Sequence, residues 1–313
     1  VRGGGLDPKK GALRRAPRGA SYGGFISACL DESPPPLKEY LGGAAWMLDC
    51  VFGLHPDGMV ALAPPERFIV KCDWKSGAEN FCGDAYHVGT AHYSATASGF
   101  IPGDVRETGP HAHGYLMENG HSFIGHSLFE WFGPPFGMWG YPEAVQQGFD
   151  LSRFDAQQLD MMKHVPPTIG TIFPNFSYLR FPQPARPGEF PMAFTNVRMW
   201  QPSGPGEMEL WVWEFDYKFA GQQHNDDCYL AGQFGFGAGG IFEQDDTAVG
   251  EGIAQGGASP WARRLGNQLH YGQERIAPDP EWQGPGQHYA SIYGEYSQEA
   301  FWRTWLAKMR GQN

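Results

Sequence analysis

His87 and His92, two histidines five positions apart, are the residues of this chain best suited to bind a metal ion. Asp84 precedes His87 by three positions, and Asn80 precedes Asp84 by four. On a continuous helix, positions 80, 84 and 87 share one face. His92 would then point about 140° away from His87, at 3.6 residues per turn. Gly89 lies between the histidines and can end the helix, which would let both imidazoles converge on one ion.

Two imidazoles and one carboxylate form the facial triad that holds non-haem Fe(II) and leaves positions open for O₂ and substrate. A third ligand is therefore required. The best candidates are Asp245 and Asp246, which follow the apolar, glycine-rich segment 235–242. The alternative for this acidic pair is a solvated loop or a helix cap, and the alternative for the histidines is a chance spacing. Neither pattern alone establishes a metal site.

The composition favours a loop-rich globular protein with much β-structure, because the 313 residues include 11 Trp, 13 Tyr, 22 Phe, 44 Gly and 26 Pro. A net charge of −11 argues against a nucleic-acid surface. No apolar run is long enough to span a membrane. The five cysteines lack any CxxC, CxH or CxxH spacing, which fits free thiols in a reducing, cytoplasmic setting.

The elements that must position these residues can be predicted from periodicity and from glycine and proline. Residues 21–30 are expected to form a strand with a glycine kink, and residues 37–52 a helix. A strand at 66–72 leads into the histidine segment. The remaining expectations are strands at about 168–182, 191–200 and 207–219, a turn at 203–206, and a helix at 224–235.

Two helix starts are predicted from capping residues. Ser152 with Asp155 resembles a capping box that opens a helix towards His164. Ser297 is expected to cap a final amphipathic helix, whose apolar side chains are Phe301, Trp302, Trp305, Leu306 and Met309. Together the elements predict an α+β fold, a mainly antiparallel sheet with helices on one side.

Two further groups of residues invite a functional explanation. The segment 131–142 (WFGPPFGMWGYP) is too interrupted for a regular element, and a lid or pocket wall is favoured over a membrane-surface contact. Four more histidines lie in loop-like segments without a carboxylate or cysteine at ligand spacing, namely His111, His113, His121 and His126. We expect these to be surface or packing histidines.

Three segments in order resemble the large subunit of Rieske-type aromatic-ring-hydroxylating dioxygenases. Residues 73–92 (DWKSGAENFCGDAYHVGTAH) resemble that family's catalytic-domain signature. Residues 242–246 (FEQDD) match its carboxylate-ligand segment, and residues 293–309 (YGEYSQEAFWRTWLAKM) resemble its closing helix. The resemblance covers about residues 10–313 and implies a helix-grip (Bet v 1/START-like) α+β domain, a curved antiparallel sheet with helices on one side.

The resemblance also implies roles for individual residues. His87, His92 and Asp246 would bind mononuclear Fe(II), with Asp245 as the alternative carboxylate. Asp84 would bridge an iron-binding histidine to a histidine of a Rieske [2Fe–2S] cluster in a neighbouring subunit, as a route for electrons. Asn80 and Tyr86 would support or border the iron pocket. Substrate would lie against apolar residues for which core packing is the alternative, namely Phe81, Val88, Trp200, Phe236 and Phe242.

The implied reaction adds O₂ to an aromatic hydrocarbon, of polycyclic or biphenyl type, to give a cis-dihydrodiol. Electrons from NADH would arrive through a reductase and a ferredoxin, and a small β subunit in an (αβ)₃ assembly is a further expectation. One alternative is a related monooxygenase or demethylase. Another is a helix-grip protein that binds a ligand without chemistry, because fold does not settle function.

The departure from the family concerns the Rieske cluster. Its two Cys and two His ligands come from CxH and CxxH pairs, and neither pair occurs in this sequence. Residues 1–36 resemble the end of a Rieske domain and its linker, and residues 37–313 the mononuclear-iron catalytic domain. The expectation is an N-terminally incomplete large subunit, which binds iron but cannot receive electrons. A lineage without the cluster is the alternative.

Overall fold

The computed structural model describes residues 15–84, 87–100, 104–107, 109–128, 130, 133–265 and 276–312. The chain divides into two compact units, Val1–Tyr40 and Leu41–Asn313. The division falls after Tyr40, whereas the sequence interpretation placed it after residue 36. The residues that were predicted to bind metal or substrate all belong to the second unit.

The described part of the first unit is mainly a β-hairpin. Strand β1 (Arg18–Tyr22) pairs antiparallel with β2 (Phe25–Cys29). Gly23 and Gly24 join them with φ angles of 56° and 88°, which glycine adopts without a steric penalty. The predicted single strand with a kink is therefore wrong, because the two glycines reverse the chain.

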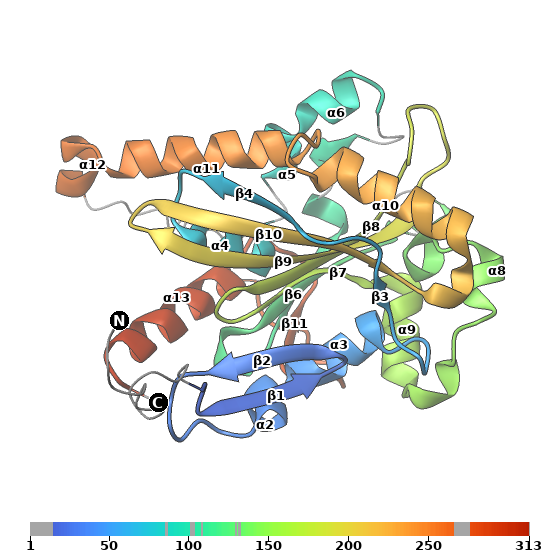
Figure 1. The fold of residues 1–313 in the computed structure, drawn as a ribbon, viewed down its shortest axis with the longest axis horizontal. Helices are drawn as coiled ribbons and strands as arrows, with labels where there is room; N and C mark the ends of the chain where they lie inside the picture. The colour runs from blue at the N-terminus through green and yellow to red at the C-terminus, as the bar shows by residue number, and fades with distance from the viewer. Residues whose placement is uncertain are drawn as a thin grey trace, which may run out of the picture. The chain divides into compact units, whose positions relative to one another are not determined.

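Within the described residues, a nine-stranded sheet forms the body of the second unit (Figure 1). Its order is β11-β5-β6-β7-β8-β9-β10-β3, with β4 also paired to β10, and the pairings are antiparallel. The strands are β3 (Val60–Ala61), β4 (Glu66–Val70), β5 (Ala112–Leu116), β6 (Ser122–His126), β7 (Pro167–Ile172), β8 (Phe176–Gln183), β9 (Met192–Gly204), β10 (Glu207–Asp216) and β11 (Gln287–Tyr289).

The predicted strands at 66–72, 191–200 and 207–219 are confirmed as β4, β9 and β10. The strand predicted at 168–182 is a hairpin of β7 and β8. Strands β5, β6 and β11 were not predicted, because these short, histidine-containing sequences lack the alternation typical of a half-buried strand.

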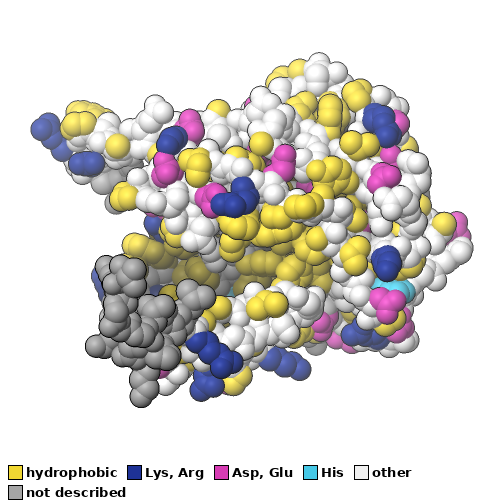
Figure 2. All heavy atoms as spheres, in the orientation of Figure 1, with side chains coloured by type: hydrophobic (Ala, Val, Ile, Leu, Met, Phe, Trp, Pro, Cys, Tyr) yellow, Lys and Arg dark blue, Asp and Glu magenta, His cyan; other side chains and the backbone are white. Residues whose placement is uncertain are grey.

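Strand β10 shows the alternation most clearly. Leu210 and Val212 are buried, whereas the alternating residues Trp211 and Trp213 are partly exposed. Successive side chains of a strand point to opposite faces, so one face of β10 joins the core and the other meets solvent. Hydrophobic side chains gather over the long strands β9 and β10 on the surface in Figure 2.

Helices pack against both faces of the sheet. Helix α4 (Trp74–Gly83) contacts β6, β7 and β9, and α10 (Gln222–Phe236) contacts β9 and β10. On the other face, Phe52 of α3 (Gly43–Phe52) meets Tyr178 of β8 with ring centroids 5.4 Å apart. The predicted α+β class with an antiparallel sheet is confirmed, and α3 adds a helix on the second face.

The helix predicted over 37–52 is two helices. Gly42, with a φ of 50°, separates α2 (Leu37–Leu41) from α3. The helix predicted at 224–235 is confirmed as α10. No helix in the described part of the chain is both long and apolar enough to cross a membrane. The remaining α-helices of the described residues are α5 (Val88–Ala91), α6 (Tyr93–Ala97), α8 (Glu143–Gln146), α9 (Ala156–His164), α11 (Glu243–Gly257), α12 (Pro260–Leu265) and α13 (Tyr296–Met309). The 3₁₀ helices are η1 (Val105–Glu107), η2 (Gly109–His111), η3 (Glu118–Gly120), η4 (Pro134–Gly140), η5 (Leu151–Arg153) and η6 (Lys218–Ala220).

The capping box of α9 lies three residues after its predicted position. Asp155, rather than Ser152, is the N-cap, and its Oδ1 accepts the Gln158 N–H at 2.8 Å. The Gln158 side chain accepts the Asp155 N–H at 3.0 Å, which completes the box. Asp155 Oδ2 also accepts a hydrogen bond from Trp46 Nε1 at 2.8 Å. One side chain thus starts α9 and ties it to α3.

Asp155→Ala is expected to lower the free energy of unfolding by about 1–2 kcal/mol, because the helix loses its N-cap. Chemical denaturation measures this loss. Ser152→Ala is the matched control, since Ser152 is exposed and its hydroxyl bonds the Asp150 carboxylate at 2.6 Å. Its effect is expected to stay within about 0.5 kcal/mol. Equal losses in the two variants would contradict the assignment of Asp155 as the cap.

The last helix also begins differently from its prediction. Glu295 is the N-cap of α13, and Ser297 lies buried in the first turn. Phe301 is fully buried, but Leu306 and Met309 are 41% and 67% exposed. The buried face of α13 is therefore narrower than the sequence pattern indicated.

A pocket of about 1080 Å³ is lined in part by the aromatic segment, and the predicted pocket wall is confirmed for Gly137, Met138, Gly140, Tyr141 and Pro142. Trp139 is fully buried beneath it and donates to the Pro167 carbonyl at 3.0 Å. Trp131 and Phe132 lie outside the described residues. The pocket is lined by Gly137, Met138, Gly140, Tyr141, Pro142, Glu143, Gln146, Leu151, Leu159, Lys163, Phe190, Pro191, Met192, Gln223, His224 and Asp227.

Candidate metal centre

The histidine segment is not one helix with a break at Gly89. Helix α4 begins at its N-cap Asp73, which accepts the Lys75 N–H at 3.0 Å, and ends at Gly83. A second helix, α5, begins after His87 and contains Gly89. The predicted helical stripe through residues 80, 84 and 87 is therefore wrong. The change of direction comes earlier, at Asp84, whose φ and ψ of −96° and 66° are not helical.

This break brings both histidines to one point. His87 Nε2 lies 3.3 Å from His92 Nε2, and the two rings are nearly perpendicular, with an interplanar angle of 73°. Asp246, in the first turn of α11, places Oδ1 3.3 Å from His87 Nε2 and 3.2 Å from His92 Nε2. Three candidate ligand atoms from two distant segments thus form a nearly equilateral triangle.

The geometry separates the two neighbouring aspartates. Asp246 Oδ1 faces the Nε2 atoms of both rings, whereas Asp245 Oδ2 lies 3.2 Å from Nδ1 of His92. Ser94 Oγ donates to the same Asp245 oxygen at 3.3 Å. Asp246 Oδ1 is therefore the carboxylate oxygen that converges with both Nε2 atoms, and Asp245 contacts His92 on the opposite side of its ring.

Asp84 orients the other ring. The His87 backbone N–H donates to Asp84 Oδ1 at 3.1 Å, and His87 Nδ1 lies 3.3 Å from the same oxygen. The Asp84 carbonyl oxygen also accepts a hydrogen bond from His87 Nδ1. Ligand histidines commonly bond a carboxylate or carbonyl through the nitrogen that does not face the metal, which fixes the tautomer. Both rings have such a partner.

The electrostatics of the triad favour a bound cation. Burial opposes a charge on His87, but hydrogen bonds to Asp246 and Asp84 outweigh it and raise the pKa of His87 to about 10. Burial also opposes the Asp246 carboxylate, yet the bonds from His87 and His92 hold its pKa well below its usual value. A metal ion must therefore displace a proton from His87, so that binding releases protons.

The supporting residues predicted from the sequence lie at different distances from the triad. Asn80 is linked to the site through its backbone carbonyl, which accepts the Asp84 N–H at 3.1 Å. Val88 follows His87 directly and is partly buried. Tyr86 lies outside the described residues. Catalytic or substrate roles for Asn80 and Val88 stay predictions.

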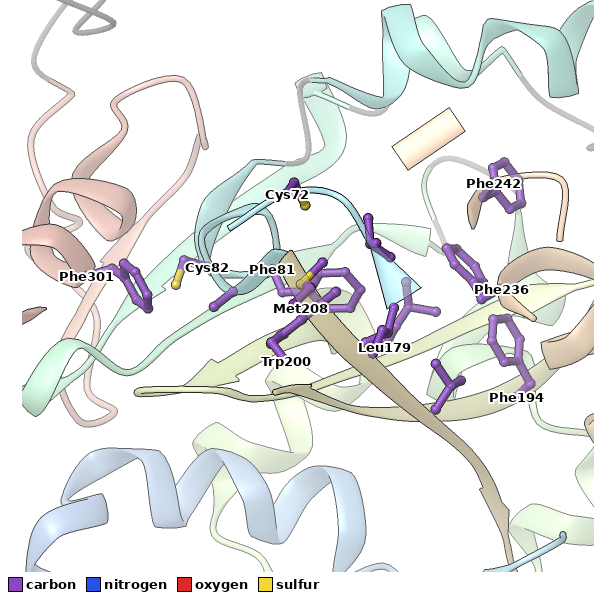
Figure 3. Packing of buried hydrophobic residues seen from close by; sticks show 14 of the residues in the cluster. Cys72, Phe81, Cys82, Leu179, Phe194, Trp200, Met208, Phe236, Phe242 and Phe301 are labelled. Carbon is purple, nitrogen blue, oxygen red and sulfur yellow. The ribbon is translucent and has the colours of Figure 1, made fainter. Parts of the chain in front are cut away.

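Four of the five predicted substrate residues belong to one aromatic cluster in the core (Figure 3). Phe242 contacts the metal site, since its ring centroid lies 5.1 Å from that of His92, and it stacks on Phe236 at 5.2 Å. Phe81 and Trp200 meet edge to face at 5.3 Å. None of the five residues lines the 1080 Å³ pocket described above. Their role in substrate binding stays a prediction.

A buried guanidinium occupies the middle of this cluster. The Arg198 Cζ atom lies 4.9 Å, 5.5 Å and 5.1 Å from the ring centroids of Phe81, Trp200 and Phe236. Arg198 Nη1 pairs with Glu243 Oε2 at 2.8 Å, and both side chains are almost fully buried. Glu243 opens α11 three residues before Asp246, so this ion pair joins the sheet to the helix that carries Asp246.

The other histidines pack inside the protein more than the sequence indicated. His121 is fully buried, and its Nδ1 accepts the Phe173 N–H at 3.0 Å. His126 is 1% exposed and bonds Thr168 Oγ1 through Nδ1 at 2.6 Å. His113 Nδ1 meets His288 Nε2 at 2.9 Å. His111 is partly buried. The expectation of packing is confirmed for His121 and His126, and a surface position is wrong for them.

Sequence reasoning missed Ser94 and the Arg198–Glu243 pair. Ser94 follows His92 by two positions, and only its shared contact with Asp245 reveals its place at the site. Arg198 lies in a strand pattern in which a charged residue predicts a solvent-facing position. No spacing in the sequence connects it to Glu243.

Comparisons with known proteins agree over most of the chain. A family model described as "Ring hydroxylating alpha subunit (catalytic domain)" matches residues 37–282. Over 311 residues the chain is 50% identical to the N,N-dimethyl phenylurea N-demethylase subunit alpha of Sphingobium sp. (strain YBL2). The aligned region covers 98% of this chain and 68% of that protein. The chain is 29% identical over 321 residues to the large oxygenase component of the naphthalene 1,2-dioxygenase system of Pseudomonas putida, with coverages of 98% and 67%.

A solved structure agrees with these matches. Naphthalene 1,2-dioxygenase from Rhodococcus sp. bound to indole is similar with a TM-score of 0.82 at 30% sequence identity, over 95% of this chain and 67% of that one. The chain therefore spans about two thirds of the length of each of these three proteins.

Proposed function

The chain belongs to the family of ring-hydroxylating oxygenase alpha subunits, and we propose that His87, His92 and Asp246 hold one Fe(II) as its oxygenase centre. The observation that carries this proposal is the convergence of their three ligand atoms within 3.3 Å of one another. Two imidazoles and one carboxylate are the donor set of mononuclear non-haem iron oxygenases. Bound in this way, Fe(II) leaves open positions for O₂ and substrate.

The surrounding residues support the same assignment. Asp84 and Asp245 hold the outer nitrogens of the two imidazoles, and so fix the tautomers in which each Nε2 faces inwards. Phe242 packs edge to face on His92 and helps to keep water from that side of the centre. A dry apolar surrounding suits an aromatic substrate held by burial.

For the reaction, the relative at 50% identity favours oxidative N-demethylation of an aryl-bearing substrate. The ring dihydroxylation predicted from the sequence, which gives a cis-dihydrodiol, is the second candidate and is favoured by the naphthalene dioxygenases. We propose the N-methylated arylurea as the first substrate class to test, because the identity to that relative is higher.

Asp84 is proposed as the point of electron entry. Its side chain is 25% exposed while it holds His87, so it can face another protein surface and the centre at once. We propose that residues 1–36 end a Rieske domain and that residues 37–313 are the catalytic domain. Ferredoxin and reductase partners that deliver electrons from NADH, a small β subunit and an (αβ)₃ assembly are proposals from the same family membership.

The activity can be tested without those partners. Hydrogen peroxide is O₂ already reduced by two electrons, so it balances either reaction by itself. In demethylation, one peroxide oxygen leaves in formaldehyde, which carries the carbon of the N-methyl group, and the other leaves as water. In ring oxidation, both peroxide oxygens are added to the aromatic ring. The Fe(II)-loaded chain is expected to release formaldehyde from N,N-dimethyl phenylurea and to give N-monomethyl product, as measured by chromatography.

His92→Ala is the control and is expected to abolish the product. A cis-dihydrodiol from naphthalene with no formaldehyde from the urea would select the second candidate reaction. Iron bound at one equivalent with no oxidation of either substrate would overturn the proposed activity and favour a helix-grip protein that only binds its ligand.

A further inference from the structure

Within the described residues, a second group of three side chains could hold a metal ion, besides His87, His92 and Asp246. The candidate ligand atoms of Asp216, His224 and Cys228 all lie within 4.8 Å of one another, as do those of the iron triad. Asp216 Oδ2 lies 3.1 Å from His224 Nε2 and 2.7 Å from Cys228 Sγ, and the last two atoms are 3.3 Å apart. The proposed function makes no use of these residues.

Two neighbouring elements, β10 and α10, carry the three side chains. Asp216 is the last residue of β10. His224 lies in the first turn of α10, and Cys228 follows it by four positions, so that both project from the same side of that helix. Asp216 and Cys228 are almost fully buried, whereas His224 lines the 1080 Å³ pocket. The group is therefore closed on the protein side and open towards the pocket.

The second carboxylate oxygen of Asp216 is held separately. Asp216 Oδ1 accepts the Tyr217 N–H at 2.7 Å and a hydrogen bond from the Tyr141 hydroxyl at 3.4 Å. These bonds turn Oδ2 towards His224 and Cys228. Outer contacts of this kind orient the ligands in metal sites.

We propose that Asp216, His224 and Cys228 form a second divalent-metal site, of the zinc class, whose fourth position opens to the pocket. One thiolate, one imidazole and one carboxylate are ligands that Zn²⁺ binds at about 2.3, 2.0 and 2.0–2.2 Å. To admit an ion at these distances with tetrahedral angles, the two separations that involve His224 Nε2 need to widen by about 0.3 Å, and the separation of Asp216 Oδ2 from Cys228 Sγ by about 0.9 Å. The carboxylate and thiolate together neutralise the dication, and a water or small donor from the pocket completes a tetrahedron.

Cobalt(II) distinguishes this site from the iron triad, because only the second site contains sulfur. The full chain saturated anaerobically with Co²⁺ is expected to bind two equivalents and to show a near-ultraviolet thiolate-to-cobalt charge-transfer band. Cys228→Ser is expected to lose the band and one equivalent. His87→Ala is expected to lose one equivalent and keep the band, so that failure of the iron site and failure of this site are separable.

Cys29→Ser is the matched control, since Cys29 is a partly buried free thiol in the first unit. It is expected to keep the band. His224→Gln retains the thiol and alters a residue at the pocket wall, and is expected to weaken Co²⁺ binding at least about tenfold. This variant decides the matter if Cys228→Ser does not fold. A saturated wild-type chain without a thiolate band, or a His224→Gln variant with unchanged affinity, would overturn the site.

Discussion

Asp246→Ala is expected to abolish Fe(II) binding, whereas Asp245→Ala is expected to weaken it only about 10–100-fold. The two residues are adjacent, carry the same side chain and lie in the same turn of α11. Their difference is geometric. Asp246 Oδ1 lies 3.3 Å and 3.2 Å from the Nε2 atoms of His87 and His92, whereas Asp245 Oδ2 approaches the outer nitrogen of His92. Removal of the first takes away a ligand, while removal of the second loosens a ring.

The measurement is the amount of iron retained after anaerobic loading and desalting, followed by a titration of affinity. Asp245→Ala serves as the control for adding alanine to α11, and His87→Ala as the positive control for loss of a ligand. Ser94→Ala is expected to have a smaller effect than Asp245→Ala, since it removes only a 3.3 Å bond to that carboxylate. Loss of iron in Asp245→Ala with retention in Asp246→Ala would exchange the two roles.

The convergence of His87, His92 and Asp246 could be anticipated because each lies in a short segment that resembles a motif of the family, and both the family and its fold class are confirmed. The path of the chain between them could not. Periodicity carries a helix through Asp84, yet α4 ends at Gly83, where an added Cβ would lie 2.7 Å from the Gln298 side chain of α13. Only the packed structure reveals that constraint.

The same limit applies to buried charge. Arg198, Glu214 and Asp216 lie in strand sequences where a polar residue predicts exposure, but all are buried. Each has a partner from a segment distant in sequence or from a neighbouring strand, such as Asn196 Nδ2 on Glu214 at 2.8 Å. Burial of such groups follows from their partners, and local pattern holds no information about them.

Arg198→Met is expected to lower the free energy of unfolding by about 3–5 kcal/mol at pH 8, because it leaves Glu243 buried without its partner. Methionine fills much of the volume beside Phe81, Trp200 and Phe236, so the loss reports charge more than packing. Arg67→Met is the matched control. The Arg67 guanidinium also lies over a ring, that of Trp211, and pairs with Glu209 at 2.6 Å, but its side chain is 51% exposed. Its loss is expected to cost at most about 1 kcal/mol.

The effect of Arg198→Met should depend on pH. Burial raises the pKa of Glu243 to about 7. The charge of Arg198 lowers this pKa, and the charge of Asp246 adds to the rise. Because the folded-state pKa lies above the ordinary 4.5, Glu243 takes up a proton as the pH falls through 7, and the ion pair then contributes less. The loss of stability in Arg198→Met is therefore expected to shrink between pH 8 and pH 5.

The double variant Arg198→Met with Glu243→Gln separates charge from shape. If the unpaired carboxylate causes the loss, the double variant recovers most of the stability at pH 8 and its difference from wild type no longer changes with pH. Iron affinity is a second measurement of the effect of Arg198→Met, since Glu243, the partner of Arg198, opens the helix that holds Asp246. Arg198→Met is expected to bind iron more weakly than Arg67→Met. A double variant as unstable as Arg198→Met would show that Arg198 acts through its packing on the three rings.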